Sequence, residues 1–227
     1  MTPVPEPGTL YRLLAWLSPA YPVGAYTYSH GLEWAVEVGD VRDRDSAGAW
    51  IDDVLRHGGG RSDGILLAHA FRADDAATVA ELAELGTALA PGAERRLETT
   101  AQGRAFLAAT QAAWPTERLA WLEALPVDAR PYPVVVGVAA AGHGLPLGSL
   151  LPAYLHAFTA NLVSAAVRLV PLGQSDGQRL VARLEPAVHA VAKAAAQAPL
   201  DEIGGATLLA DLASLCHEVQ YSRLFRS

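Results

Sequence analysis

Apolar residues recur every three or four positions along most of this chain, a spacing that predicts amphipathic helices rather than β-strands. It predicts helices over residues 9–17, 31–39 and 176–198, among others. Residues 132–142 contain three consecutive valines, which would suit a strand. A single strand would have no sheet partner, so we expect a buried helix there. The pattern therefore predicts an all-α fold, a single-domain bundle of about ten helices over residues 1–227.

Apolar stripes on four of the predicted helices are expected to face the core. In each stripe, apolar side chains share one side of the helix at helical spacing. The stripes are Leu10, Leu13, Leu14 and Leu17 in the first helix; Leu97, Ala101, Ala105 and Ala108 in the helix after Pro91-Gly92; Leu180, Leu184, Val188, Val191 and Ala195 in residues 176–198; and Leu208, Leu212, Leu215 and Val219 in the last helix, residues 208–221.

Residues 152–170 form the most apolar segment, and a helix without a polar face is normally buried on all sides. We expect it to be the central helix of the bundle. Pro152 suits its first turn, where the missing N–H costs nothing. After Pro171 ends this helix, Asp176 is expected to cap the next one.

Three polar residues of this central helix, Asn161, Ser164 and Arg168, share one stripe. Buried polar groups must be hydrogen-bonded, either within the fold or across a subunit interface. We interpret the stripe as structural or as part of a dimer interface. The alternative is a helical enzyme, in which the stripe lines a pocket together with His156 or His189.

Composition places the chain among soluble cytoplasmic proteins. The single cysteine, Cys216, excludes an intramolecular disulfide and suits a reducing compartment. A formal net charge of −7 argues against nucleic-acid binding, because no basic face is expected to neutralise phosphates. We find no apolar run long enough to span a membrane and no signal peptide. Residues 1–8 are rich in proline and are expected to be flexible.

Motifs of the common enzyme classes are absent from the sequence. It lacks the P-loop, the zinc-binding H-E-x-x-H pattern and any C-x-x-C pair. The histidines are scattered, and His217, beside Glu218, is only a weak candidate for a metal ligand. The sequence therefore shows no local catalytic or cofactor motif, although an enzyme could still assemble a site from residues that are distant in the sequence.

Two segments have the composition of binding sites. The tail, residues 221–227, combines Tyr, Phe and two Arg, types that dominate binding hot spots. The tyrosine loop, residues 18–30, carries Tyr21, Tyr26 and Tyr28, which combine apolar area with a hydroxyl group. The structural alternatives are a tail folded back on the last helix and a loop packed over the core.

Three stretches of the chain resemble the urease accessory protein family UreF. They are LSPAYPVGAYTYSHGLEWAVE (17–37), ANLVSAAVRLVPLGQSDGQ (160–178) and HEVQYSRLFRS (217–227). Ala25, Tyr26 and His30 stand where Gly, Phe and Gln are frequent in that family. Gln174, Asp176 and Gln178 belong to the central motif, and we count them with the structural or dimer-interface residues.

The resemblance implies an all-α, non-enzymatic chaperone that forms a homodimer. UreF-like proteins bind UreD/UreH and recruit the GTPase UreG, and the assembly delivers nickel to apo-urease. Nickel is then handled by the assembly, and GTP is bound by the partner. A plain dimerisation module is the simpler alternative.

The resemblance also suggests where the partners bind. It places UreD/UreH on the tail, through Tyr221, Arg223, Leu224, Phe225 and Arg226. We further hypothesise that Arg226 lies near Tyr26 and Tyr28, and that the three contribute to the surface that recruits UreG. The central helix or its neighbours are expected to contribute to the homodimer interface.

Overall fold

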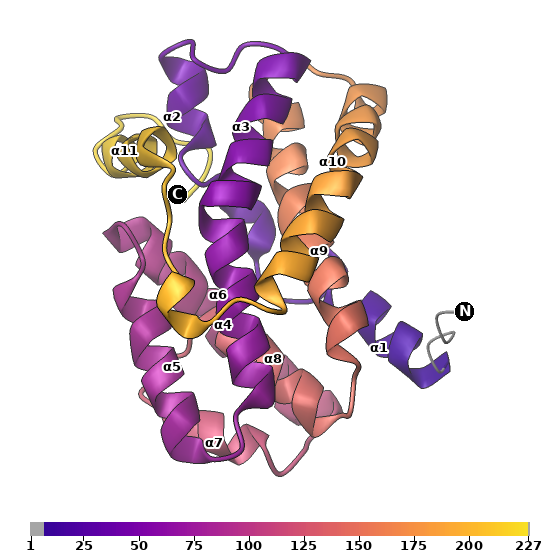
Figure 1. Ribbon diagram of the computed structural model, residues 1–227. Coiled ribbons are helices and arrows are strands. Elements are labelled where there is room, and N and C mark those ends of the chain that lie inside the picture. The colour runs from indigo at the N-terminus through magenta and orange to yellow at the C-terminus, as the bar shows by residue number, and fades with distance from the viewer. Residues whose placement is uncertain (1–6, 227) are drawn as a thin grey trace.

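The computed structural model describes residues 7–226, and the regular elements in this range are all helical. The predicted all-α class is therefore confirmed. The expected flexible segment 1–8 falls mostly outside the described residues, although a helix already begins at Pro7. The α-helices are α1 Pro7–Trp16, α2 Leu32–Glu37, α3 Arg44–His57, α4 Gly59–Arg72, α5 Ala76–Ala88, α6 Ala93–Ala113, α7 Leu119–Glu123, α8 Tyr132–Gly142, α9 Leu147–Leu169, α10 Gln174–Ala195 and α11 Leu208–His217, with short 3-10 helices η1 Ala25–Thr27 and η2 Leu200–Glu202 (Figure 1).

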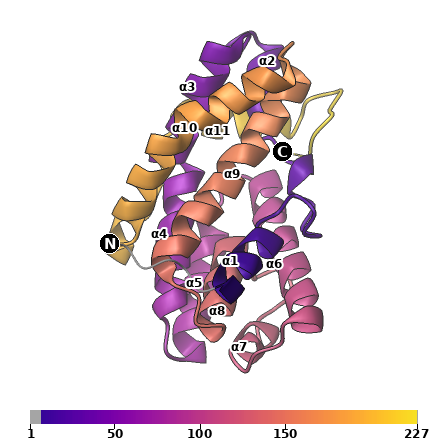
Figure 2. The ribbon, with the colours of Figure 1, turned by 90° about the vertical axis from the view of Figure 1, so that its right-hand side faces the viewer.

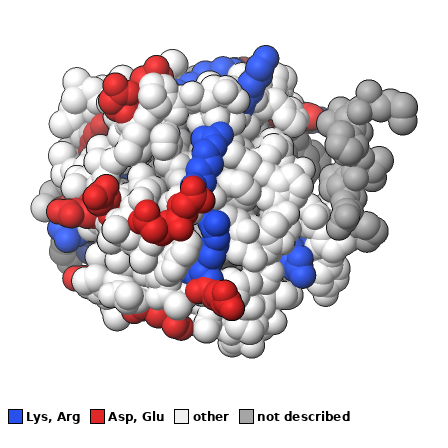
Figure 3. All heavy atoms as spheres, turned by 60° about the horizontal axis from the view of Figure 1, so that its bottom comes forward, with Lys and Arg blue, Asp and Glu red and all other residues white. Residues whose placement is uncertain are grey.

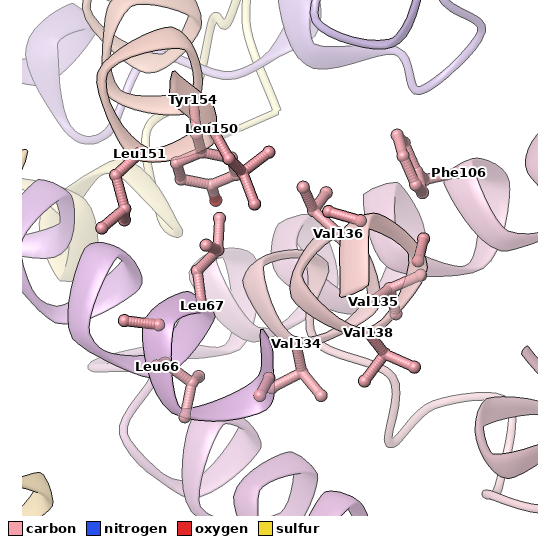
Figure 4. Packing of buried hydrophobic residues seen from close by; sticks show 14 of the residues in the cluster. Leu66, Leu67, Phe106, Val134, Val135, Val136, Val138, Leu150, Leu151 and Tyr154 are labelled. Carbon is pink, nitrogen blue, oxygen red and sulfur yellow. The ribbon is translucent and has the colours of Figure 1, made fainter. Parts of the chain in front are cut away.

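Two clusters of buried apolar side chains form the interior. The larger one surrounds α4 and α8, where Leu66 and Leu67 lie near the valines of α8 (Figure 4). The smaller one lies between α2, α3, α10 and the C-terminal half of α9. Phe158 of α9 packs against both clusters, so α9 joins the two parts of the core.

Helix α8 is buried as predicted. Val134, Val135, Val136 and Val138 are fully buried, so packing outweighs the preference of valine for strands. Gly137 lets α8 approach α4 closely, because a Cβ atom there would lie 2.6 Å from the backbone oxygen of Leu67.

Helix α9 begins five residues before the predicted start, after Pro146, and Figure 2 shows α10 running alongside it. Pro152 is therefore inside the helix rather than in its first turn, a correction to the sequence prediction. Burial on all sides is also wrong, because His156, Ser164 and Arg168 are exposed. The uncovered face is the one that carries the polar stripe.

Helix α9 also contradicts the expectation that no apolar segment is long enough to span a membrane. Its 23 residues, with a mean hydropathy of 1.4 over the most apolar window, would be long and apolar enough to cross a membrane. Half of that window is buried inside the protein, and central helices of water-soluble proteins pass the same test. We therefore interpret α9 as the central helix of the bundle.

The stripe of α10 faces the core as predicted, that of α1 does so only in part, and those of α6 and α11 do not. In α1 Leu13 is buried and Leu17 packs against the core, while Leu10 and Leu14 are exposed. In α6 the buried face carries Glu98, Gln102 and Phe106. The stripe of α11, Leu208, Leu212, Leu215 and Val219, points outward.

Helix α11 turns its small residues inward because its backbone approaches α2 closely. A Cβ atom at Gly31 would lie 2.7 Å from the backbone nitrogen of Ser214, and Gly31 has a positive φ of 75°. Ala210, Ala213 and Ser214 fill this narrow contact. Leucine side chains would hold the two helices apart, so the leucine face is left in solvent.

Gly103 of α6 provides a test of the packing, because it contacts the segment that leads into α8. A Cβ atom there would lie 1.8 Å from the backbone oxygen of Arg130. We predict that Gly103→Ala lowers the free energy of unfolding in urea by about 3 kcal/mol. Gly148→Ala, at a helical glycine with open space around it, should leave stability unchanged or slightly raised. Equal effects of the two variants would contradict this packing.

Candidate functional site

The tyrosine loop is anchored by His30 at its C-terminal end. The Nε2 atom of His30 lies 2.9 Å from Oε1 of Glu98 on α6, and its ring meets Phe158 edge-on. His30 has a φ of 56°, an uncommon conformation for a residue other than glycine. Burial lowers the pKa of this imidazole, and the Arg95 charge acts in the same direction. The loop thus ends at a fixed, buried point.

The three tyrosines of the loop have different surroundings. Tyr21 is buried, and its hydroxyl group is hydrogen-bonded to Thr110 at 2.8 Å. Tyr28 is only 3% exposed, whereas Tyr26 is 64% exposed. The pKa of Tyr28 is raised, mainly by burial, although a hydrogen bond to Arg226 opposes this. Tyr26 alone therefore offers a large free surface, and the other two pack as the structural alternative expected.

The polar stripe of α9 holds the backbone of the tyrosine loop. The Asn161 side chain donates to the Tyr28 carbonyl at 3.3 Å, and Arg168 donates to the Tyr26 carbonyl at 2.6 Å. Ser164, between them on the stripe, is exposed. Asn161 and Arg168 are hydrogen-bonded, as predicted for the stripe. The stripe is partly exposed, and it supports the backbone of the loop instead of forming a buried interface.

The tail folds back onto the body of the protein after α11 (Figure 1). Phe225 enters the smaller core cluster, and the Arg168 guanidinium lies 4.2 Å from the centre of its ring. The Arg226 N–H donates to the Thr27 carbonyl at 2.7 Å. The tyrosine loop and the tail therefore lie side by side. Tyr221, Arg223, Leu224 and Arg226 are exposed.

His217 is fully buried between two carboxylates. Its Nε2 lies 3.1 Å from Glu33 and its Nδ1 lies 2.7 Å from Glu94. With both ring nitrogens engaged in this way, the residue is not placed to bind a metal ion, which corrects the weak candidate from the sequence. Among residues 7–226, no group of three His, Cys, Asp or Glu side chains could hold a metal.

The outward stripe of α11 forms an exposed apolar face of the helix. Leu209 of the same helix and Tyr221 and Leu224 of the tail are exposed as well. Exposed apolar side chains gathered in this way often mark an interaction site. The spacing of the leucines predicted that this stripe faces the core. The small residues on the opposite face of α11 are the ones that are buried.

A cavity of about 210 Å³ lies beside the polar stripe, lined by Asn161, Ser164 and His156. This is the pocket that the enzyme alternative required. His189, the other histidine of that alternative, is exposed on α10, where it faces Glu185. A second cavity of about 260 Å³ shares the polar residues His30, Asp63, Arg95 and Thr99 with the first.

Glu98 and Arg95, which lie between these cavities, form an ion pair. Glu98 pairs with Arg95 and His30 and accepts a hydrogen bond from Gln102 at 3.0 Å. Burial would raise the pKa of Glu98, but Arg95 and His30 together lower it to about 2. Glu98 is therefore a paired carboxylate and is not placed to act as a base.

The residues of the central motif lie at the turn between α9 and α10. Gln174 and Gln178 are exposed, so neither is a buried structural group. Asp176 lies in the first turn of α10 and pairs with Arg179 at 2.9 Å. Gly173 occupies the N-cap, which corrects the predicted capping role of Asp176.

Comparison with known proteins covers nearly the whole chain. The UreF family model matches residues 41–185. A urease accessory protein UreF of Rhodopseudomonas palustris (strain BisB5) is 55% identical over 225 residues, covering 98% of this chain and 93% of the relative. Those of Xanthobacter autotrophicus and a Methylobacterium species are 55% identical over 224 residues and 56% identical over 218 residues. They cover 97% and 95% of this chain, and 92% and 87% of the relatives.

Phe225 and Leu224 form a matched pair for testing how the tail is docked. Phe225 is 3% exposed and Leu224 is 65% exposed. We predict that Phe225→Ala lowers the free energy of unfolding by about 3 kcal/mol, because it empties a core position. Leu224→Ala should change it by less than about 0.5 kcal/mol. Urea denaturation of both variants checks this, and no effect of Phe225→Ala would mean that the tail is not docked.

Asp63 predicts a pH dependence of stability. Burial raises its pKa from 3.8 to about 6, although Arg95 and a hydrogen bond from Tyr154 at 2.9 Å oppose the rise. Between pH 3.8 and about 6 the folded state therefore holds a proton that the unfolded state has lost. This contribution to stability is complete below the lower value and disappears as the pH rises through about 6.

We predict that Asp63→Asn, which removes this titration, gains stability relative to the wild type as the pH rises from 4 to 7. Urea denaturation at a series of pH values measures the difference. Asp53→Asn, at an exposed position of α3, is the control. A difference between Asp63→Asn and the wild type that is constant over this range would contradict the assignment.

Proposed function

Because this chain belongs to the UreF family of urease accessory proteins, we propose that it is the nickel-insertion chaperone that joins UreD/UreH to the GTPase UreG. Proteins of this family support urease maturation, so the chain assists an enzyme and is not one itself. In this proposal nickel is cargo that the assembly delivers to apo-urease, and the chain holds no resident cofactor. GTP is bound by UreG, and the assembly works in the cytoplasm.

The observation that carries the proposal is the apolar surface formed by α11 and the tail. Leu212 and Leu215 in the middle of α11, and Tyr221 and Leu224 in the tail, are exposed. Aromatic and apolar side chains of this kind form the centre of many protein interfaces. We assign this surface to UreD/UreH, which extends the site predicted from the tail alone.

The surface where the tyrosine loop contacts the tail suits a second partner. Tyr26 and Arg226 are both exposed, and a backbone hydrogen bond from Arg226 to Thr27 joins their segments. Tyrosine and arginine are the residue types most enriched at binding hot spots. We assign Tyr26 and Arg226 to the recruitment of UreG. Tyr28, which is buried, would act only by supporting Arg226.

The uncovered face of α9 supports a homodimer. His156 and Ser164 are exposed along it, and small residues between them would allow a second helix to come close. Nucleic acid is not expected as a partner, given the net charge of −7. On the face shown in Figure 3, acidic and basic side chains lie interspersed on a largely uncharged surface.

The first test concerns UreD/UreH. We predict that Leu212→Ser combined with Leu215→Ser weakens capture of UreD/UreH by at least about tenfold, because it replaces the middle of the apolar surface. Thermal stability should fall only slightly, since the two side chains are 47% and 43% exposed. Val127→Ser, at an exposed position in the loop after α7, is the control. A plain dimerisation module would show undiminished capture.

The second test concerns UreG. We predict that Tyr26→Ala and Arg226→Ala each reduce capture of UreG by the complex with UreD/UreH by about tenfold. Arg42→Ala, at an exposed arginine, is the control. Undiminished capture by both variants would remove this assignment. Light scattering at micromolar concentration tests the dimer, and a monomer would contradict it.

A further inference from the structure

The backbone of the tail is held by a carboxylate from the other end of the chain. Glu33 on α2 is almost fully buried. Its Oε1 accepts the Leu224 N–H at 2.6 Å, and its Oε2 accepts the Phe225 N–H at 2.8 Å. These bonds use the main chain of the tail, so they leave the Leu224 side chain free on the surface.

A second set of bonds links Glu33 to helix α6 through His217. The imidazole bridges Oε2 of Glu33 at 3.1 Å and Oε2 of Glu94 at 2.7 Å. The other oxygen of Glu94 accepts a hydrogen bond from Arg223 at 2.5 Å. The tail is thus held at Arg223, Leu224 and Phe225, on a cluster formed by Glu33, His217 and Glu94.

Glu218 ties the same region to the start of α6. Its Oε1 accepts the N–H groups of Ala93 at 2.6 Å and Glu94 at 3.3 Å. The first N–H groups of a helix have no partner within the helix, so this carboxylate serves as the cap that Gly92 cannot provide. Helices α2, α6 and α11 therefore meet at this cluster.

The chemistry of the cluster favours the docked tail. A carboxylate accepts hydrogen bonds, and Glu33 accepts two from the backbone of the tail. A buried carboxylate that loses its donors is strongly unfavourable. If the tail left, Glu33 would lose both of these donors. Undocking therefore exposes Phe225 and also removes two donors from a buried charge.

We propose that Glu33, with His217 and Glu94, is a positioning site that keeps residues 221–226 docked before any partner arrives. The carboxylates need not touch the partner. They fix the backbone, so that Tyr221 and Leu224 are presented in one arrangement, and binding then requires less ordering of the tail. The role in partner binding depends on the proposed function, whereas the docking itself does not.

Limited digestion of the full-length protein with trypsin tests the docking directly. Cleavage after Arg223 requires release of Leu224, whose N–H is bonded to Glu33. We expect Glu33→Gln to accelerate this cleavage by at least about tenfold, because an amide offers one acceptor oxygen in place of two. Glu37→Gln, at an exposed position that ends the same helix, should match the wild type. Cleavage after Arg104, within α6, reports on general unfolding.

Two results would overturn the proposal. The first is an unchanged rate after Arg223 in Glu33→Gln, and the second is an equal acceleration after Arg104, which would mean general destabilisation. Glu94→Gln is the second variant in case Glu33→Gln does not fold. It keeps the bonds of Glu33 to the backbone, so we expect a smaller acceleration confined to Arg223. No acceleration in this variant would exclude Glu94 from the site.

Capture of UreD/UreH separates the positioning role from the proposed function. If the positioning role and the proposed function are both correct, Glu33→Gln accelerates cleavage after Arg223 and weakens capture of UreD/UreH by about tenfold. Leu224→Ala then weakens capture of UreD/UreH without changing cleavage. Faster cleavage with undiminished capture by both variants would leave the docking in place. It would overturn the assignment of the tail to UreD/UreH.

Discussion

The burial of the Glu33 carboxylate is the constraint on which the arrangement of both chain ends depends. This side chain is needed on α2 because it accepts backbone N–H groups of the tail and faces the buried His217 of α11. A charge in that position is tolerated only while its partners stay in place. Helix α11, the tail and the start of α6 are consequently fixed relative to α2, and the rest of the surface follows from this arrangement.

The central helix contributes to the same arrangement from the opposite side. Arg168 contacts the Tyr26 carbonyl and the Phe225 ring, so one side chain meets the loop and the tail together. The polar stripe suggested a buried interface or an enzyme pocket. In the structure its side chains position the tyrosine loop and the tail. In the neighbouring cavity Glu98 is paired with Arg95 and His30, and Asp63 is hydrogen-bonded to Tyr154.

Hydrophobic spacing was sufficient to predict the all-α class and the inward face of α10, and the lack of a sheet partner was needed to predict the buried helix α8. It was not sufficient for α6 and α11, because spacing identifies a stripe and does not say whether that stripe is covered. In α11 the answer depends on Gly31, which admits only small residues at the contact with α2. In α6 the buried face carries Glu98 and Gln102, which are hydrogen-bonded to each other, and Glu98 also contacts His30 from a distant part of the chain.

The candidate site was partly accessible from the sequence. The composition of the tail and loop identified both segments, but it could not separate Tyr26 from Tyr28, or Leu224 from Phe225. Those distinctions depend on which side chain enters the core, and a tertiary contact decides that. Glu33 and Glu94 carried no signal in the sequence, because isolated glutamates on predicted helices usually face solvent.

The nickel content of urease matured in cells measures the central claim most directly. The urease operon would be expressed with the full-length protein carrying Tyr221→Ser and Leu224→Ser, two exposed positions whose replacement should preserve the fold. The account predicts that nickel in the purified urease falls to the level found without this protein, while the variant accumulates like the wild type. Urease with its full nickel content would contradict the claim that the tail carries the function.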